Sequence, residues 1–138
     1  MYTFDNALAQ ACAKVISEEP LFESLAGCRL CVLFCNKEKK SRGRIVYADT
    51  KKLSDMVSFM TGYDFVITFY ADVEYLTDKA LGVLIRHELL HIGYESRGGV
   101  VTKKIYPHDV EDFRAIIGHY GIDWPLLQDE MKKEEADG

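Results

Sequence analysis

The stretch Arg86–Ile92 constrains this chain more than any other, because it places two histidines four positions apart with a glutamate directly after the first. In an α-helix with ~3.6 residues per turn, His87 and His91 stand about 40° from each other around the axis, so both imidazoles can reach one ion. Glu88 lies beside them on the same half of the helix. This HExxH spacing is typical of a helix that binds Zn²⁺ through its histidines and uses the glutamate as general base on a metal-bound water.

The surrounding residues predict a buried helix over 77–92, which favours a metal site over a chance match. Thr77 is a suitable N-cap, Asp78 favours the positive end of the helix, and Gly93 suits the position after its last turn. A helix that is apolar nearly all round is buried, and unpartnered His and Glu within it would cost on the order of several kcal/mol. A bound metal removes that cost, whereas the alternative is a structural cluster held by hydrogen bonds. The apolar residues of the helix are Leu81, Val83, Leu84, Ile85, Leu89, Leu90 and Ile92.

A catalytic zinc site usually has three protein ligands, so the chain must supply one more His, Asp or Glu. The candidates cluster in residues 107–113, where an apolar helical stripe begins. We choose His108, which is far enough beyond His91 for a loop and a strand to bring it back to the first two histidines. Asp109 and Glu111 are the alternative ligands, although both also provide favourable charge at a helix N-terminus.

The rest of the chain predicts a mixture of helices and short strands. Phe4 to Ser17 has helical spacing and Ser54 to Gly62 reads as a short capped helix, while residues 64–70 form the most strand-like run. In chain order we expect a helix over 4–17, a connector over 21–27, an antiparallel hairpin of 29–35 with 44–48, a short helix within 49–62, a strand over 64–70, the metal helix, a strand over 100–106 and a second helix from 109.

Length and composition indicate one domain. A chain of 138 residues with 48% hydrophobic residues can bury a single core, and we expect it over 1–130 with a charged tail over 131–138. The net charge of -5 argues against general nucleic-acid binding. No segment approaches the ~20 apolar residues of a membrane span, and the first residues lack a basic region followed by an apolar run. We therefore expect a cytoplasmic protein without a membrane partner.

Three further features have two interpretations each. The basic segment Lys37–Arg44 is either a phosphate-binding finger or, as we favour, a solvated hairpin tip. Cys28 and Cys31 have metal-ligand spacing, but no second pair completes a closed site, so we interpret all four cysteines as small reduced residues. Tyr94 and Tyr106 could stabilise an oxyanion, although packing is the simpler role.

Several motifs in this order resemble the metallopeptidase family found in phages and prophages, over roughly residues 30–124. The motifs are Asp64–Ile67, His87–Ile92, His108–Phe113 and Tyr120–Gly121. The resemblance implies a compact zincin-like domain in which His87 and His91 are the HExxH ligands, Glu88 is catalytic, and His108 is the histidine of a downstream HDxxxF pattern. A weaker similarity is to SprT/Spartan-like proteases, in which the downstream Phe follows the histidine after four positions rather than the five found here.

We therefore expect an α+β fold of zincin-like type, with a short, mostly antiparallel sheet packed against the HExxH helix and flanking helices. The expected function is that of a zinc metallopeptidase that acts on a protein or peptide substrate. His87, His91 and His108 would hold Zn²⁺, and Glu88 would activate the water. The alternatives are a non-catalytic zinc-containing protein that binds a host factor, and a DNA-associated SprT-like protease that uses the segment Lys37–Arg44.

Overall fold

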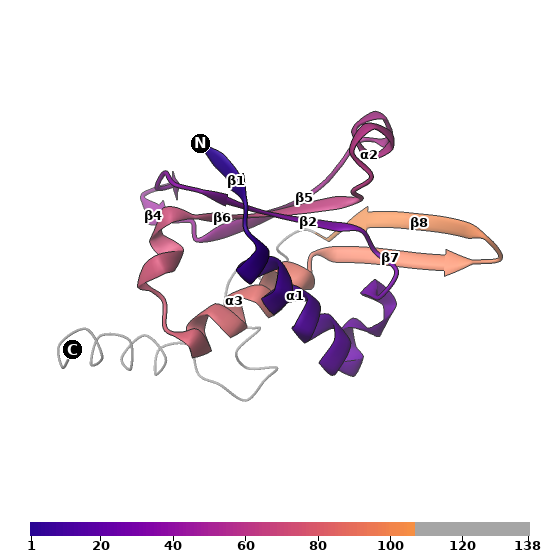
Figure 1. Ribbon diagram of the computed structural model, residues 1–138, viewed down its shortest axis with the longest axis horizontal. Coiled ribbons are helices and arrows are strands. Elements are labelled where there is room, and N and C mark those ends of the chain that lie inside the picture. Colours follow the sequence, from indigo (N-terminus) through magenta and orange to yellow (C-terminus); the bar gives the residue numbers. More distant parts are fainter. Residues whose placement is uncertain (107–138) are drawn as a thin grey trace.

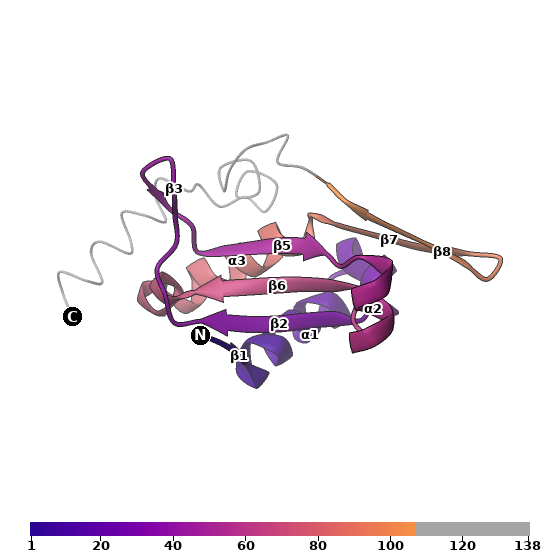
Figure 2. The same ribbon diagram turned by 90° about the horizontal axis from the view of Figure 1, so that it is seen from above.

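A four-stranded sheet with two helices on one of its faces forms the centre of the fold, which the computed structural model describes over residues 1–106 (Figure 1, Figure 2). In spatial order the strands are β1 (Tyr2–Phe4), β2 (Leu30–Cys35), β6 (Phe65–Tyr70) and β5 (Ala48–Lys52), and the helices are α1 (Asn6–Glu18) and α3 (Asp78–Leu89). The pairs β1–β2 and β5–β6 are antiparallel and β2–β6 is parallel, so the predicted α+β class with a mostly antiparallel sheet is confirmed. The predicted second helix and charged tail lie outside the described residues.

The two central strands are apolar along nearly their whole length, as expected for strands that have a neighbour on each side. In β6, Phe65, Ile67 and Phe69 are fully buried, and they belong to the core cluster that includes α3 and α1. The edge strand β5 has the polar sequence Ala48-Asp49-Thr50-Lys51-Lys52, which an edge position tolerates. Register places Ala48, Thr50 and Lys52 beside the core residues of β6, and hence on the face that α3 covers.

Shorter elements connect these parts. The predicted short helix is confirmed as α2, with the Ser54 side chain accepting a hydrogen bond from the backbone N–H of Val57 and Gly62 ending the helix at φ 81°. None of the helices within residues 1–106 has the length and apolarity needed to cross a lipid bilayer. The remaining elements are the 3₁₀ helices η1 (Pro20–Leu25) and η2 (Ala71–Tyr75), helix α2 (Asp55–Thr61), and strands β3 (Lys40–Ser41), β4 (Arg44–Ile45), β7 (Ile92–Arg97) and β8 (Val100–Ile105).

The predicted hairpin of residues 29–35 with 44–48 is wrong. After β2 the chain leaves the sheet, turns through the small hairpin β3–β4, and returns as β5 at the opposite edge. The position beside β2 is taken by β6 instead, because two strands that are apolar on both faces bury more surface when they pair with each other. The connection between β2 and β6 is long enough for the crossover that a parallel pair requires.

The helix that carries the HExxH motif ends at Leu89, earlier than the predicted Ile92. The Leu90 N–H bonds to the Arg86 carbonyl at 3.1 Å, but the His91 N–H reaches only back to the Glu88 carbonyl, also at 3.1 Å. This tighter turn brings the chain directly into β7, which pairs with β8 in a hairpin separate from the main sheet. Gly93 therefore lies in β7 and does not end the helix as predicted.

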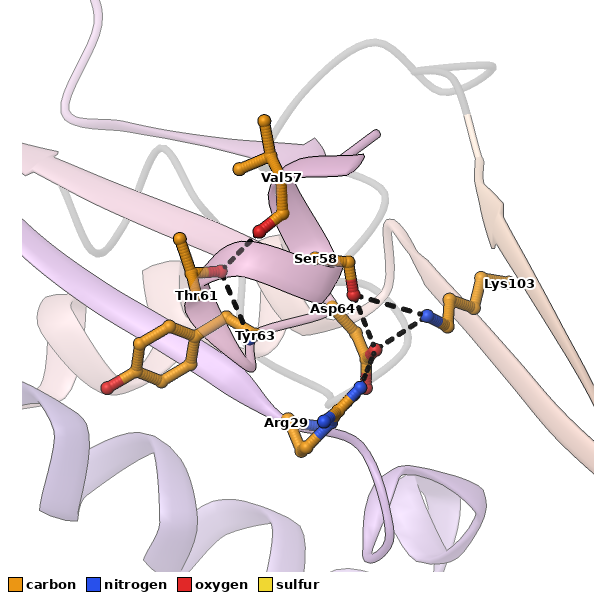
Figure 3. A network of polar contacts seen from close by, with 7 residues as sticks. All are labelled: Arg29, Val57, Ser58, Thr61, Tyr63, Asp64 and Lys103. Carbon is orange, nitrogen blue, oxygen red and sulfur yellow. Dashed lines mark hydrogen bonds and ion pairs between the residues drawn. The ribbon is translucent and has the colours of Figure 1, made fainter. Parts of the chain in front are cut away.

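A buried carboxylate connects the β7–β8 hairpin to the beginning of strands β2 and β6 (Figure 3). Asp64, which is 1% exposed, accepts hydrogen bonds from the Arg29 backbone N–H at 3.0 Å, the Arg29 guanidinium at 3.1 Å and the Ser58 hydroxyl at 3.3 Å. The Lys103 ammonium, on β8, lies 2.7 Å from the same carboxylate. Burial by itself would raise the pKa of Asp64, but the hydrogen bonds from Arg29 and Lys103 hold that pKa well below its ordinary 3.8.

Replacement of Asp64 by Asn should lower the free energy of unfolding by about 2–3 kcal/mol at pH 7, because the cations that meet there lose their charged partner. A lowered folded-state pKa gives stability that is complete above the unfolded pKa and is lost as the pH falls. The difference between wild type and variant should therefore be constant above about pH 5 and shrink below about pH 4 in urea unfolding measurements. Glu38→Gln, at an exposed carboxylate, is the control; a difference that stays constant down to pH 2.5 would contradict this role of Asp64.

Candidate metal centre

The two motif histidines and the intervening glutamate form a buried cluster at the end of α3. His87 is 7% exposed, Glu88 2% and His91 9%. One potential ligand atom from each residue lies within 4.8 Å of those of the other two. The two imidazole rings have centroids 5.1 Å apart and meet edge to face at 83°. The early end of the helix therefore leaves the predicted convergence of the three side chains intact.

The donor set and its spacing fit a divalent metal ion. Two nitrogens that each bind zinc at about 2.1 Å stand about 3.4 Å apart in tetrahedral geometry, and the potential ligand atoms here lie within 4.8 Å of one another. Neutral imidazoles are preferred ligands of zinc and of other first-row transition metals. Among residues 1–106, this is the one group of three His, Cys, Asp or Glu side chains with such spacing, and neither Cys28 nor Cys31 forms another.

Glu88 is held from the sheet by Thr50 of β5. The Thr50 hydroxyl donates to Oε1 at 2.8 Å, while Oε2 lies 3.9 Å from Nε2 of His87. Burial raises the pKa of Glu88 to about 7; the hydrogen bond from Thr50 opposes this shift, and the charge of Asp49 adds to it. A carboxylate with a pKa near neutral accepts and returns a proton readily, as a general base must.

His91 is fixed by the end of β8. Its Nδ1 lies 2.7 Å from the Tyr106 carbonyl oxygen, and the Tyr106 N–H donates to the His91 carbonyl at 2.7 Å. A carbonyl oxygen only accepts hydrogen bonds, so Nδ1 is the donor, and in the neutral imidazole Nε2 is then the nitrogen with the lone pair. Partners of this kind fix the tautomer and the ring orientation of metal-binding histidines.

The absence of a side chain at Gly93 makes room for Tyr106. A Cβ added at Gly93 would lie 2.8 Å from the phenolic oxygen and 2.9 Å from two ring carbons of Tyr106. Tyr94 instead packs against the core cluster, with its ring 3.7 Å from where a Cβ of Gly27 would be. Both tyrosines thus have packing contacts, in agreement with the simpler of their two predicted roles.

The contributions of Thr50 and Tyr106 to the site were not predicted. Thr50 lies in a polar stretch whose strand character the sequence does not reveal, and Tyr106 acts through its backbone, for which no side-chain pattern exists. Of the predicted site residues, His87, Glu88 and His91 come together as expected. His108 and the alternative ligands Asp109 and Glu111 lie outside the described residues.

Part of the basic segment Lys37–Arg44 has an internal role. The Lys39 ammonium pairs with Asp49 at 2.5 Å and lies 5.0 Å from the centre of the Tyr70 ring. The Asp49 carboxylate also accepts a hydrogen bond from the Tyr70 hydroxyl at 2.8 Å. Lys39 thus stabilises the outer face of the sheet. The other four cations are exposed in the β3–β4 hairpin or shortly before it: Lys37, Lys40, Arg42 and Arg44.

The four cysteines are thiols with no disulfide between them. Burial raises the pKa of Cys12 and of Cys28 to about 12, so both stay protonated at neutral pH. Cys12 belongs to the core cluster, whereas Cys31 and Cys35 share the opposite face of the sheet with Tyr70. Their predicted role as small, unreactive residues agrees with this placement, although only Cys12 lies within the main core.

Comparison with known proteins identifies a family for this chain. A family model described as "Putative phage metallopeptidase" matches residues 1–133, which include the cluster at the end of α3. No curated protein matches the chain, and no solved structure does.

Replacement of Gly93 by Ala should displace the Tyr106 ring and lower the free energy of unfolding by about 1–3 kcal/mol. Because the Tyr106 carbonyl orients His91, the same variant should bind a divalent metal ion more weakly, by about 10-fold or more. Denaturant unfolding and competition with a chelating dye measure the two effects. Gly27→Ala is the matched control, since its added methyl meets Tyr94 at an ordinary 3.7 Å; equal metal affinity in the two variants would contradict the role of Tyr106.

Proposed function

The chain belongs to the putative phage metallopeptidase family, and from this premise we propose that it is a zinc-dependent peptidase with Glu88 as its general base. The observation that carries the proposal is the buried cluster of His87, Glu88 and His91, with potential ligand atoms within 4.8 Å of one another. Side chains of this kind are rarely buried together without an ion or a reaction that needs them.

We propose His108 as the third ligand beside His87 and His91. The chain length supports this assignment, because Tyr106 is bonded to His91 twice and His108 follows only two residues later. Two residues span at most about 7.6 Å between their Cα atoms, so this short separation along the chain favours His108 as the residue that completes the site. Three imidazoles leave one coordination position for water, as in catalytic zinc sites; Asp109 and Glu111 are the alternative third ligands.

In the proposed reaction each described side chain has a separate task. A bound Zn²⁺ would polarise the peptide carbonyl and lower the pKa of the attacking water. Glu88 accepts the proton of that water on Oε2, the oxygen nearer to His87, and returns it to the leaving amine. The hydrogen bond between His91 Nδ1 and the Tyr106 carbonyl keeps the imidazole in one orientation throughout.

Replacement of Glu88 by Gln should leave the zinc content unchanged and reduce the rate of peptide hydrolysis by about 10²–10⁴-fold, because the amide cannot accept the proton. Metal analysis and cleavage of labelled casein measure the two quantities. Glu95→Gln, at an exposed position of β7, is the control. An unchanged rate in Glu88→Gln would exclude this mechanism. A wild-type protein with one equivalent of zinc that cleaves no protein would favour the non-catalytic binding protein instead.

Replacement of His108 by Ala should weaken zinc binding by more than the 10–100-fold typical of residues that only orient a ligand. His119→Ala is the matched control, since it removes the one histidine that has no proposed part in the site. Equilibrium dialysis against zinc measures both affinities. If His108→Ala binds zinc as wild type does while Asp109→Asn or Glu111→Gln loses it, the third ligand is the acidic residue and His108 is not a ligand.

A further inference from the structure

The two oxygens of the Glu88 carboxylate have different surroundings. Oε1 points to β5, where it accepts the hydrogen bond from the Thr50 hydroxyl, and Oε2 lies 3.9 Å from the imidazole of His87. The Thr50 hydroxyl also lies 3.3 Å from the backbone carbonyl oxygen of Glu88. One hydroxyl thus contacts both the backbone and the side chain of the glutamate, which limits rotation of the carboxylate.

Thr50 is well placed to hold the Glu88 carboxylate, because the pairing of β5 with β6 fixes the backbone of Thr50. It lies opposite Ile67, a residue of the central strand β6 with 0% exposure, and its side chain faces α3. Threonine is branched at Cβ, so its χ1 angle is restricted and its hydroxyl direction is set by the strand. The Glu88 side chain, by contrast, has three rotatable bonds and would populate several rotamers without a partner.

We propose that Thr50 is a positioning residue that holds Oε1 of Glu88 and thereby keeps Oε2 turned toward the histidine pair. This inference rests on the proposed peptidase function, since it assigns proton transfer to Oε2. The Thr50 hydroxyl occupies Oε1, which leaves Oε2 as the oxygen that takes the proton of the water and passes it to the leaving amine. Thr50 touches neither substrate nor metal in this scheme and acts only through Glu88.

The test compares Thr50→Val, which keeps the branched shape without the hydroxyl, with Thr50→Ser, which keeps the hydroxyl. In the zinc-loaded full chain, Thr50→Val should lower kcat for labelled casein by about 10-fold or more, because a misplaced base transfers protons poorly. KM and zinc content should change less than about twofold, and Thr50→Ser should restore most of kcat. A loss of zinc, or an equal loss of kcat in both variants, would show a merely structural role and overturn the proposal.

Thr68→Val is the matched control, because it makes the same change on the neighbouring strand β6, on the sheet face opposite to Thr50. It should leave kcat unchanged. If Thr68→Val lowers kcat as much as Thr50→Val does, loss of sheet stability explains both and the proposal fails.

Crystal structures of wild type and Thr50→Val give a readout that is independent of hydrolysis. The carboxylate of Glu88 should turn away or occupy several positions in Thr50→Val. An unmoved carboxylate would overturn the proposal, whatever the kinetics. If the wild-type protein cleaves no substrate, the proposed function fails, but the position of Glu88 in these structures still decides whether Thr50 holds it.

Discussion

Burial of ionisable side chains at the end of α3 is the constraint on which the rest of the structure depends. Transfer of a carboxylate and two imidazoles from water to this interior costs on the order of several kcal/mol unless polar partners or an ion compensate. The fold supplies partners from outside the helix: the Thr50 hydroxyl for Glu88 and the Tyr106 carbonyl for His91. These partners come from β5 and from the end of β8, so the sheet edge and the hairpin are both needed to form one site.

The β7–β8 hairpin needs contacts beyond its own two strands, because an isolated hairpin is marginally stable in water. It is attached at one point on β8 and at a second point directly after that strand. Lys103 pairs with the buried Asp64, which directly precedes strand β6. Tyr106 is hydrogen-bonded to His91 through its backbone N–H and its carbonyl. An ion pair at one end of the sheet and the orientation of a candidate metal ligand are thus coupled through a single strand, which joins the stability of the fold to the geometry of the site.

Features that depend only on residues close together in the sequence could be predicted from it. Thr77 and Ser54 cap their helices as expected, and β6 lies where the β-branched and aromatic residues concentrate. Strand pairing could not be predicted in the same way, since it brings together residues far apart in the chain. The sequence of β5 is polar and does not indicate a strand. The pairing of β2 with β6 depends on how much apolar surface the two strands bury together, which cannot be read from either strand alone. The end of α3 was also missed, because pairing of β7 with β8 ends it early.

The sequence by itself predicted that His87, Glu88 and His91 would converge, because their spacing places them on one side of a helix. They do converge, although His91 follows the end of α3 in a tighter turn. Tertiary structure alone decided which oxygen of Glu88 is held and which nitrogen of His91 carries the hydrogen. Thr50 is 38 residues from Glu88 in the sequence, and Tyr106 is 15 residues from His91 and contributes its backbone carbonyl. The register of β5 on β6 and of β8 on β7 places them, and register follows from packing over the whole domain.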